Sequence, residues 1–347
     1  IKLLTQLYGD RMLIANATGC SSIYGGNLPS TPYTTDANGR GPAWANSLFE
    51  DNAEFGLGFR LTVDQHRARV MRLLAQFADK IPAELNDALH AEATPDVRRA
   101  QVAELRNALQ GVEGAEQLLT DADALVEKSV WLIGGDGWAY DIGFGGLDHV
   151  LSLTENVNIL VLDTQCYSNT GGQASKATPL GAVTKFGEHG KRKARKDLGV
   201  SMMMYGHVYV AQISLGAQLN QTVKAIQEAE AYPGPSLIIA YSPCEEHGYD
   251  LALSHDQMRQ LTATGFWPLY RFDPRRADEG KLPLALDSRP PSDALAETLL
   301  QEQRFRRLNA QQPEVAGQLW KDAAADLQKR YDFLAQLAGK AEKSTSE

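Results

Sequence analysis

The chain has 347 residues and a net charge of −9; 43% of its residues are hydrophobic and 22% are charged. This composition is ordinary for a globular protein and excludes a disordered chain, a collagen-like repeat and a low-complexity array. The acidic balance argues against general nucleic-acid binding, which favours a strongly basic face. The longest apolar runs are far too short to span a bilayer, so no membrane segment is expected.

The chain starts at Ile1 with no signal segment after it, so we expect a piece of a longer protein that begins inside a fold. Its three cysteines, Cys20, Cys166 and Cys244, do not make a disulfide framework. A reducing, cytoplasmic setting is therefore expected. Isolated thiols of this kind are ordinarily inert core residues.

The first third of the chain changes character near residue 62. Residues 12–15 predict a short buried strand, followed by a turn rich in glycine and serine. Residues 27–58 show no period and predict a loop, and a loop of this length is usually functional. Between residues 62 and 127 apolar side chains recur at helical spacing, which predicts two to four helices on a charged, amphipathic insertion.

From residue 129 onward, short apolar segments alternate with helical ones. This alternation predicts an α/β fold with a doubly wound, mainly parallel sheet. A charged helical tail is expected from about residue 292 to 338, packed against another part of a larger protein, and residues 342–347 are expected to be disordered. The predicted strands are 130–133, 158–162, 208–210 and 236–241, and the predicted helices are 145–153, 198–205 and 217–231.

Four chemically distinctive features follow predicted strands. Each cysteine comes after one strand, and the turn Gly135-Asp136-Gly137 comes after another. Parallel sheets bind ligands at the carboxyl ends of their strands. Four such features at one sheet edge are hard to explain by chance, and they predict a site there.

The turn around Asp136 has the makings of a phosphate site. Glycines let the backbone approach a phosphate closely, and a helix N-terminus offers free N–H groups to an anion. A carboxylate at this point would repel a phosphate unless a divalent cation lay between them, so Asp136 is placed like a Mg²⁺ ligand that bridges to a diphosphate. The same triplet is also compatible with a tight turn in which Asp136 caps the helix.

The next strand opens into a polar loop at residues 164–172. Mg²⁺ prefers six oxygen ligands in near-octahedral geometry. The Asp136 carboxylate, the Thr164 hydroxyl and the main-chain carbonyl of Cys166 would supply three of them. Phosphate oxygens and a water would supply the rest.

These motifs resemble a known family. A Gly-Asp-Gly followed, after a helix and a strand, by a loop bearing Asn or Thr is the thiamin diphosphate signature. Gly-Gly-Asp-Gly-Trp-Ala-Tyr-Asp-Ile-Gly-Phe-Gly-Gly-Leu-Asp (134–148) and Tyr-Ser-Asn-Thr-Gly-Gly-Gln (167–173) closely resemble pyruvate:ferredoxin (flavodoxin) oxidoreductase, as do Ala-Thr-Gly-Cys-Ser-Ser (17–22) and Tyr-Ser-Pro-Cys (241–244). The similarity covers almost the whole chain, as the C-terminal portion of that large enzyme. Thr164 stands where many thiamin enzymes carry Asn, but it is the residue that this family uses.

The resemblance implies an activity and three cofactors. The activity is oxidative decarboxylation of pyruvate with CoA to acetyl-CoA and CO₂, with electrons passing through iron–sulfur clusters to flavodoxin or ferredoxin. The cofactors are thiamin diphosphate, Mg²⁺ and a [4Fe–4S] cluster held by four cysteines. Cys20 and Cys244 match two of these ligands, and a Cys-x-x-Cys pair in a preceding segment would supply the others. From spacing alone the two could equally be buried thiols. Cys166 matches no cluster ligand and is given only a main-chain role.

The resemblance also implies the roles of individual segments. Residues 1–61 would form the first part of the thiamin diphosphate and cluster domain, 62–128 the helical insertion, 129–290 the core thiamin diphosphate-binding domain and 291–347 the helical tail. Asn169 is expected to be catalytic, donating a hydrogen bond to a substrate or intermediate oxygen, although it could also be a turn residue that caps the loop. The expected cofactor-binding residues are Cys20, Gly135, Asp136, Gly137, Trp138, Thr164, Gln165, Cys166, Tyr167, Ser168 and Asn169, and the expected metal ligands are Cys20, Cys244, Asp136, Thr164 and Cys166.

One part of a thiamin site is missing from the sequence. Thiamin activation needs a carboxylate from a separate pyrimidine-binding domain, and no candidate stands out. The chain is therefore expected to be inactive alone and to pair with the N-terminal portion of the same enzyme, within a homodimer. The alternatives are a relative that acts on another 2-oxo acid or runs as a CO₂-fixing synthase, and a non-catalytic electron-transfer module.

Other motifs carry weaker hypotheses. Cys244 and His247 could form half of a zinc site, but no second pair has ligand spacing. A dinucleotide-binding fingerprint fails because Asp148 stands where glycine or alanine is needed. The basic run at residues 191–196 is either a solvated loop or an electrostatic contact with CoA phosphates or an acidic electron carrier.

Overall fold

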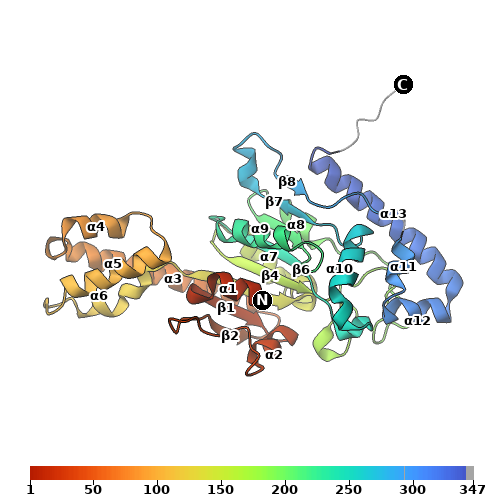
Figure 1. Ribbon diagram of the computed structural model, residues 1–347, viewed down its shortest axis with the longest axis horizontal. Coiled ribbons are helices and arrows are strands. Elements are labelled where there is room, and N and C mark those ends of the chain that lie inside the picture. Colours follow the sequence, from red (N-terminus) through yellow and green to blue (C-terminus); the bar gives the residue numbers. More distant parts are fainter. Residues whose placement is uncertain (293, 341–347) are drawn as a thin grey trace.

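The computed structural model describes residues 1–292 and 294–340 (Figure 1). Its centre is one sheet of eight strands in the order β2-β1-β3-β4-β6-β5-β7-β8. The first six strands in this order are parallel, and β7 runs antiparallel to both of its neighbours, β5 and β8. The predicted α/β class with a mainly parallel sheet is therefore confirmed. The strands are β1 (Met12–Ala17), β2 (Ala43–Ser47), β3 (Ser129–Gly135), β4 (Asn158–Asp163), β5 (Tyr209–Ile213), β6 (Ser236–Tyr241), β7 (Tyr270–Phe272) and β8 (Leu284–Leu286).

Helices cover both faces of the sheet, which is why the central strands read as continuous apolar runs. Neighbouring side chains of β3 go to opposite faces: Trp131 packs with Ile226 of α9, whereas Leu132 packs with Leu147 of α7. The helices are α1 (Lys2–Tyr8), α2 (Cys20–Gly26), α3 (Asn52–Gln76), α4 (Ala83–His90), α5 (Pro95–Ala108), α6 (Glu116–Asp121), α7 (Phe144–Ser152), α8 (Leu198–Met203), α9 (Leu219–Glu230), α10 (Ser254–Ala263), α11 (Leu295–Leu299), α12 (Gln303–Gln311) and α13 (Pro313–Leu337).

The predicted loop at residues 27–58 contains two elements that the sequence pattern missed. Edge strand β2 lies within it, and α3 begins at Asn52 rather than near residue 62. The first half of α3 lies on the sheet so closely that a Cβ on Gly56 would be 2.2 Å from a side-chain atom of Leu132. The second half runs out to α4, α5 and α6, which form a projecting lobe with a core of their own (Figure 1). Helix α3 thus crosses the predicted boundary between residues 61 and 62.

The C-terminal helices pack against the rest of this chain. Phe305 of α12 and Trp320 and Leu334 of α13 are buried in the main core, against this chain's own sheet and helices. These helices pack within this chain, and the expected contact of the tail with another part of a larger protein stays a prediction. The predicted disorder of residues 342–347 lies outside the described residues. Within the described ranges, no helix is both long enough and apolar enough to cross a membrane.

Candidate active site

The features that follow predicted strands meet at one edge of the sheet. Strands β3, β4 and β6 are adjacent and parallel, with Gly135 opposite Leu162 and Asp163 opposite Tyr241. The segments that follow these strands therefore lie at the same edge of the sheet. They contain Asp136, the loop that begins at residue 164, and residues 242–244. Strand β1, on the other side of β3, brings the start of α2 to this edge as well.

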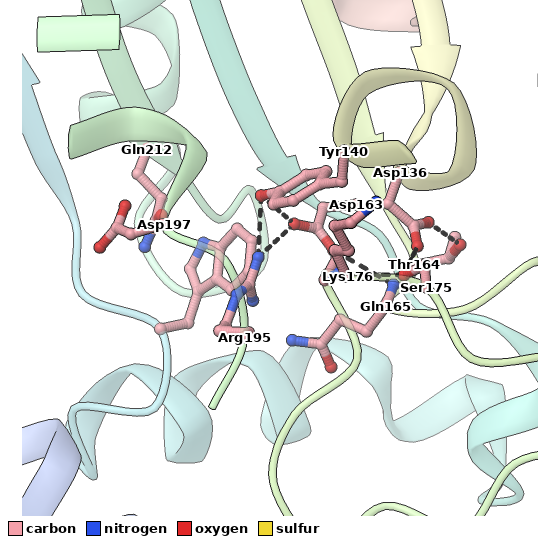
Figure 2. A network of polar contacts seen from close by, with 12 residues as sticks. Asp136, Tyr140, Asp163, Thr164, Gln165, Ser175, Lys176, Arg195, Asp197 and Gln212 are labelled. Atoms are coloured by element: carbon pink, nitrogen blue, oxygen red, sulfur yellow. Dashed lines mark hydrogen bonds and ion pairs between the residues drawn. The ribbon is translucent and has the colours of Figure 1, made fainter. Parts of the chain in front are cut away.

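Asp136 lies at the centre of a cluster of oxygen atoms (Figure 2). Its side chain is buried, and its two carboxylate oxygens accept hydrogen bonds from the Thr164 hydroxyl (2.8 Å) and the Ser175 hydroxyl (2.5 Å). The Thr164 hydroxyl is also 3.0 Å from the carbonyl oxygen of Cys166. The structure thus brings together the three oxygen groups that the sequence predicted as Mg²⁺ ligands.

The Asp136 carboxylate has no cation of its own among the described residues. Burial, followed by the negative charge of Asp163, raises the pKa of Asp136 to about 7, although hydrogen bonds from Ser175 and Thr164 oppose this shift. Asp136 occupies the N-cap position of the π-helical turn at Gly137–Ile142, yet its side chain makes no capping hydrogen bond. The alternative of a simple capping residue therefore does not account for this carboxylate. A buried carboxylate without a positively charged partner is costly even when it is hydrogen-bonded, and a divalent cation would offset that cost.

A conventional metal cluster is not present. Within residues 1–292 and 294–340, no group of three or more His, Cys, Asp or Glu side chains is gathered to hold a metal ion. A cation beside Asp136 would depend on one carboxylate together with hydroxyl, carbonyl and ligand oxygens. That donor set suits Mg²⁺, which is usually held by one or two carboxylates and by substrate phosphates.

The glycines of the turn differ in whether the rest of the chain leaves room for a side chain. A Cβ on Gly137 would lie 2.6 Å from the ring of Tyr167, and one on Gly134 would lie 2.4 Å from the ring of Trp138. A Cβ on Gly135 would meet no atom of the chain closer than the carbonyl oxygen of Leu162, at 3.9 Å. Internal packing therefore requires glycine at positions 134 and 137, whereas position 135 borders open space.

Three of the predicted loop residues, and Trp138 of the turn after β3, are held by internal contacts. Gln165 is buried with a positive φ of 61°, and the Ser168 hydroxyl donates to the Thr164 hydroxyl at 2.8 Å. Tyr167 donates to the Asp141 carboxylate at 3.2 Å, and Trp138 is buried beneath the turn. These contacts fix the loop beside Asp136.

Asn169 differs from the rest of the loop. Its side chain is exposed and makes no hydrogen bond to the described part of the chain. The turn-capping alternative thus finds no contact to support it. The catalytic role of Asn169 stays a prediction.

The three cysteines are free thiols at the same sheet edge. Cys20 is exposed at the first position of α2, while Cys166 and Cys244 are buried. The neighbouring Cys166 thiol is the main cause that lowers the pKa of Cys244 to about 6. Burial and then the charge of Cys244 raise the pKa of Cys20. The two thiols are therefore close enough to interact electrostatically. The contact between Cys166 and Cys244 was not expected from the sequence.

His247 is hydrogen-bonded within the protein and is not available to bind zinc. Its ring is buried, with one nitrogen 2.7 Å from the Thr164 carbonyl oxygen and the other 3.4 Å from the Tyr241 hydroxyl. Burial lowers the pKa of His247 to about 4, so the ring is neutral. Because both ring nitrogens have protein partners, the zinc alternative with Cys244 is not supported.

The basic run at residues 191–196 is largely used inside the protein. Arg195 is stacked 4.9 Å above the ring of Trp267 and pairs at 2.5 Å with the buried carboxylate of Asp163, which also accepts from the Tyr140 hydroxyl (Figure 2). Lys191 donates to three main-chain carbonyls of the loop at residues 175–178. Of the charged residues in this run only Arg192 and Lys193 are exposed, so the hypothesis of electrostatic docking stays a prediction for these two alone.

Sequence reasoning missed several residues that build this site. Asp163 could have been found, because it is a charged residue at the end of a predicted buried strand. Ser175 lies 39 residues after Asp136, and no local pattern connects the two. Arg195 was counted as part of a surface run, although its side chain ends on Asp163.

A separate cleft lies away from these residues. It has a volume of about 660 Å³ and lies between edge strand β2 and helix α3, with Trp44, Phe59 and Val63 in its wall and Lys128 at its border. It contains none of the predicted site residues.

Comparison with known proteins identifies the family that the chain resembles. The family model described as the C-terminal TPP-binding domain of thiamine pyrophosphate enzymes matches residues 100–240. The chain is 91% identical over 347 residues to the Escherichia coli (strain K12) protein named probable pyruvate-flavodoxin oxidoreductase, covering 100% of this chain and 30% of that protein. The resemblance to the pyruvate:ferredoxin (flavodoxin) oxidoreductases is confirmed.

A second relative has the same kind of name, and both relatives are much longer than this chain. The pyruvate-flavodoxin oxidoreductase of Rhodospirillum rubrum is 55% identical over 350 residues, which cover 99% of this chain and 29% of the relative. The chain thus spans about 30% of the length of the relatives that it matches. A solved 2-oxoglutarate:ferredoxin oxidoreductase from Magnetococcus marinus overlaps 69% of this chain and 56% of its own, with a TM-score of 0.41 and 16% identity, which is too distant to refine the fold.

Proposed function

We propose that this chain is the thiamin diphosphate-binding portion of an enzyme that oxidatively decarboxylates pyruvate. In the complete reaction, pyruvate and CoA give acetyl-CoA, CO₂, a proton and two electrons, which pass to flavodoxin. The observation that carries the proposal is the buried Asp136 carboxylate, which has no cation of its own and is grouped with the Thr164 hydroxyl and the Cys166 carbonyl. The family match over residues 100–240 supports it.

The described residues suit a Mg²⁺-bound diphosphate. Asp136, Thr164 and the Cys166 carbonyl would hold the metal, while Gly135 would leave room for the phosphates beside it. The Ser175 hydroxyl fixes the second carboxylate oxygen of Asp136 and so sets the direction of the first. When bound, thiamin diphosphate supplies the carbanion and the electron sink that decarboxylation of a 2-oxo acid needs.

Gly135→Ala tests whether the open space beside residue 135 holds the cofactor, because the substitution should not affect folding. The added methyl group meets no atom of the chain within 3.9 Å, so the melting temperature of the cofactor-free protein should not fall. We expect the apparent Kd for thiamin diphosphate with Mg²⁺ to rise about tenfold, which corresponds to about 1.4 kcal/mol. Isothermal titration calorimetry and thermal melting measure the two effects. Gly145→Ala is a matched control because it also meets nothing within 4 Å, and equal affinities for both variants would contradict the assignment.

The thiols at the same edge support a nearby redox centre. We propose that Cys20 and Cys244 are two of the four ligands of a [4Fe–4S] cluster and that the longer protein supplies the others. An iron–sulfur cluster beside the cofactor site would give electrons a short path away from it. A homodimer, a cytoplasmic location and the catalytic role of Asn169 stay predictions.

The activity is tested on the full-length protein that contains this chain. We expect pyruvate to reduce flavodoxin only when CoA, Mg²⁺ and thiamin diphosphate are present, with acetyl-CoA and CO₂ formed in equal amounts. Turnover of a different 2-oxo acid in place of pyruvate would indicate the related oxidoreductase. Absence of any 2-oxo acid turnover by protein that binds both cofactors would indicate a non-catalytic electron-transfer module.

A further inference from the structure

Gln165 has an unusual backbone conformation at a critical place. It lies between Thr164 and Cys166, whose oxygens adjoin Asp136, and its φ is 61°. A residue with a side chain rarely adopts this left-handed conformation, which persists only where surrounding contacts impose it. Rotation about the backbone of Gln165 would change the direction in which the chain leaves Thr164 and would therefore move the Cys166 carbonyl.

Three contacts hold Gln165 in place. Its main-chain N–H donates to the Asp163 carboxylate at 3.1 Å, and its carbonyl accepts from the Thr178 hydroxyl at 2.7 Å. Its side-chain carbonyl oxygen accepts from the Arg304 guanidinium at 2.7 Å. The first two contacts come from the site's own loops, whereas the third comes from α12 in the C-terminal tail.

Arg304 is buried in the core and is held there by several contacts. It is 5% exposed, and its Nε donates to the fully buried Glu302 carboxylate at 2.6 Å. The other oxygen of Glu302 accepts from Gln257 of α10 at 2.9 Å, and the main-chain carbonyl of Arg304 accepts from the N–H of Val183 at 2.9 Å. The charge of Arg304 is thus balanced and its backbone is fixed, and an N–H of its Nη2 is directed at Gln165.

The amide of Gln165 is oriented by this contact alone. Its oxygen is turned to Arg304, and its nitrogen is buried with no hydrogen-bond partner among the described residues. An unsatisfied buried donor is costly, so the amide would turn or move if Arg304 did not fix the oxygen. The contact therefore fixes the orientation of the side-chain amide, in addition to the two contacts that hold the main chain of Gln165.

We propose that Arg304 is a positioning residue that acts through Gln165 to preset the Mg²⁺–diphosphate loop. The C-terminal tail thereby takes part in the cofactor site without touching the cofactor. This inference rests on the proposed function, since it concerns the same site. Its specific content is that the loop takes its binding conformation before any cofactor arrives.

The test uses the full-length protein with Arg304→Gln, Gln165→Gly and the double variant. Arg304→Gln should weaken Mg²⁺-dependent thiamin diphosphate binding at least tenfold, measured by calorimetry well below the melting temperature. It should also speed amide hydrogen exchange in residues 164–173 of the cofactor-free protein. Arg304→Lys, which keeps one donor, should be intermediate in both measurements.

A double-mutant cycle separates positioning from general stability. Gln165→Gly removes the same contact, so adding Arg304→Gln to it should change neither the affinity nor the exchange further. The exposed Arg307 of the same helix provides the matched control Arg307→Gln, which should leave both measurements unchanged. If Arg304→Gln fails to fold, Gln165→Gly and Arg304→Lys carry the comparison.

Two outcomes overturn the inference. One is a lower melting temperature in Arg304→Gln with unchanged affinity and unchanged loop exchange. The other is additive losses in the double variant. Failure of the wild-type protein to bind thiamin diphosphate would instead refute the proposed function, and the exchange measurement on cofactor-free protein would still report on the contact between Arg304 and Gln165.

Discussion

Asp136→Ala in the full-length protein is expected to abolish Mg²⁺-dependent binding of thiamin diphosphate. The variant loses the carboxylate around which the Thr164 and Cys166 oxygens gather, and Mg²⁺ would retain only neutral protein ligands. We expect the apparent Kd to rise at least about a hundredfold, or about 2.7 kcal/mol. Calorimetric titration with the cofactor in excess Mg²⁺ measures this loss.

The fold of the Asp136 variants should survive. The folded-state pKa of Asp136 is raised to about 7 from an ordinary value near 4, so its ionisation favours the unfolded chain as pH rises through this range. Removal of the carboxylate should therefore not lower the melting temperature of cofactor-free protein at pH 7.5. Asp136→Asn keeps the shape but not the charge and should lose binding as well. Asp148→Asn, on α7, is the control that should bind normally, and normal binding by Asp136→Asn would refute the metal role.

Cys244→Ser and Cys20→Ser are each expected to lose or convert the iron–sulfur cluster. Serine replaces a thiolate by a poor iron ligand, and the two thiols lie at the edge where the sheet brings the cofactor site together. In full-length protein, the iron content and the visible absorbance should fall by at least the share of one cluster. Iron analysis and electron paramagnetic resonance of the reduced protein measure this loss.

Cys166→Ala is the informative control for the cysteine assignment. It removes the thiol next to Cys244 but retains the main-chain carbonyl proposed for Mg²⁺. The cluster should therefore persist. Loss of iron in Cys166→Ala together with full iron in Cys20→Ser would show that the ligand assignment is wrong.

The elements that could be predicted from the sequence are the ones buried on both faces. Strand β6 is found where its apolar run predicts it, at residues 236–241, because covered parallel strands need no polar alternation. Edge strand β2 has mostly exposed residues, so it carries no apolar signal and reads as loop. Helix α3 was shortened in the prediction because its first turns lie on the sheet through Gly56 rather than through a regular apolar stripe.

The site residues likewise fall into those that local sequence could predict and those that it could not. Asp136, Thr164 and Cys166 could be placed together because each follows directly from the end of a strand, and parallel pairing fixes where those ends meet. Ser175 and Arg304 reach the site from a loop and from the tail. Only the packing of the whole molecule positions them, so no local spacing could reveal them.

The contact between Arg304 and Gln165 has a consequence for biosynthesis. The two residues are 139 positions apart, so a ribosome that has just completed the loop must add the greater part of a domain before the arginine exists. Until then only two of the three contacts that hold Gln165 can form, those of its main chain with Asp163 and Thr178, and its side-chain amide lacks its partner. The last of the contacts that fix this loop therefore forms only after translation has passed α12.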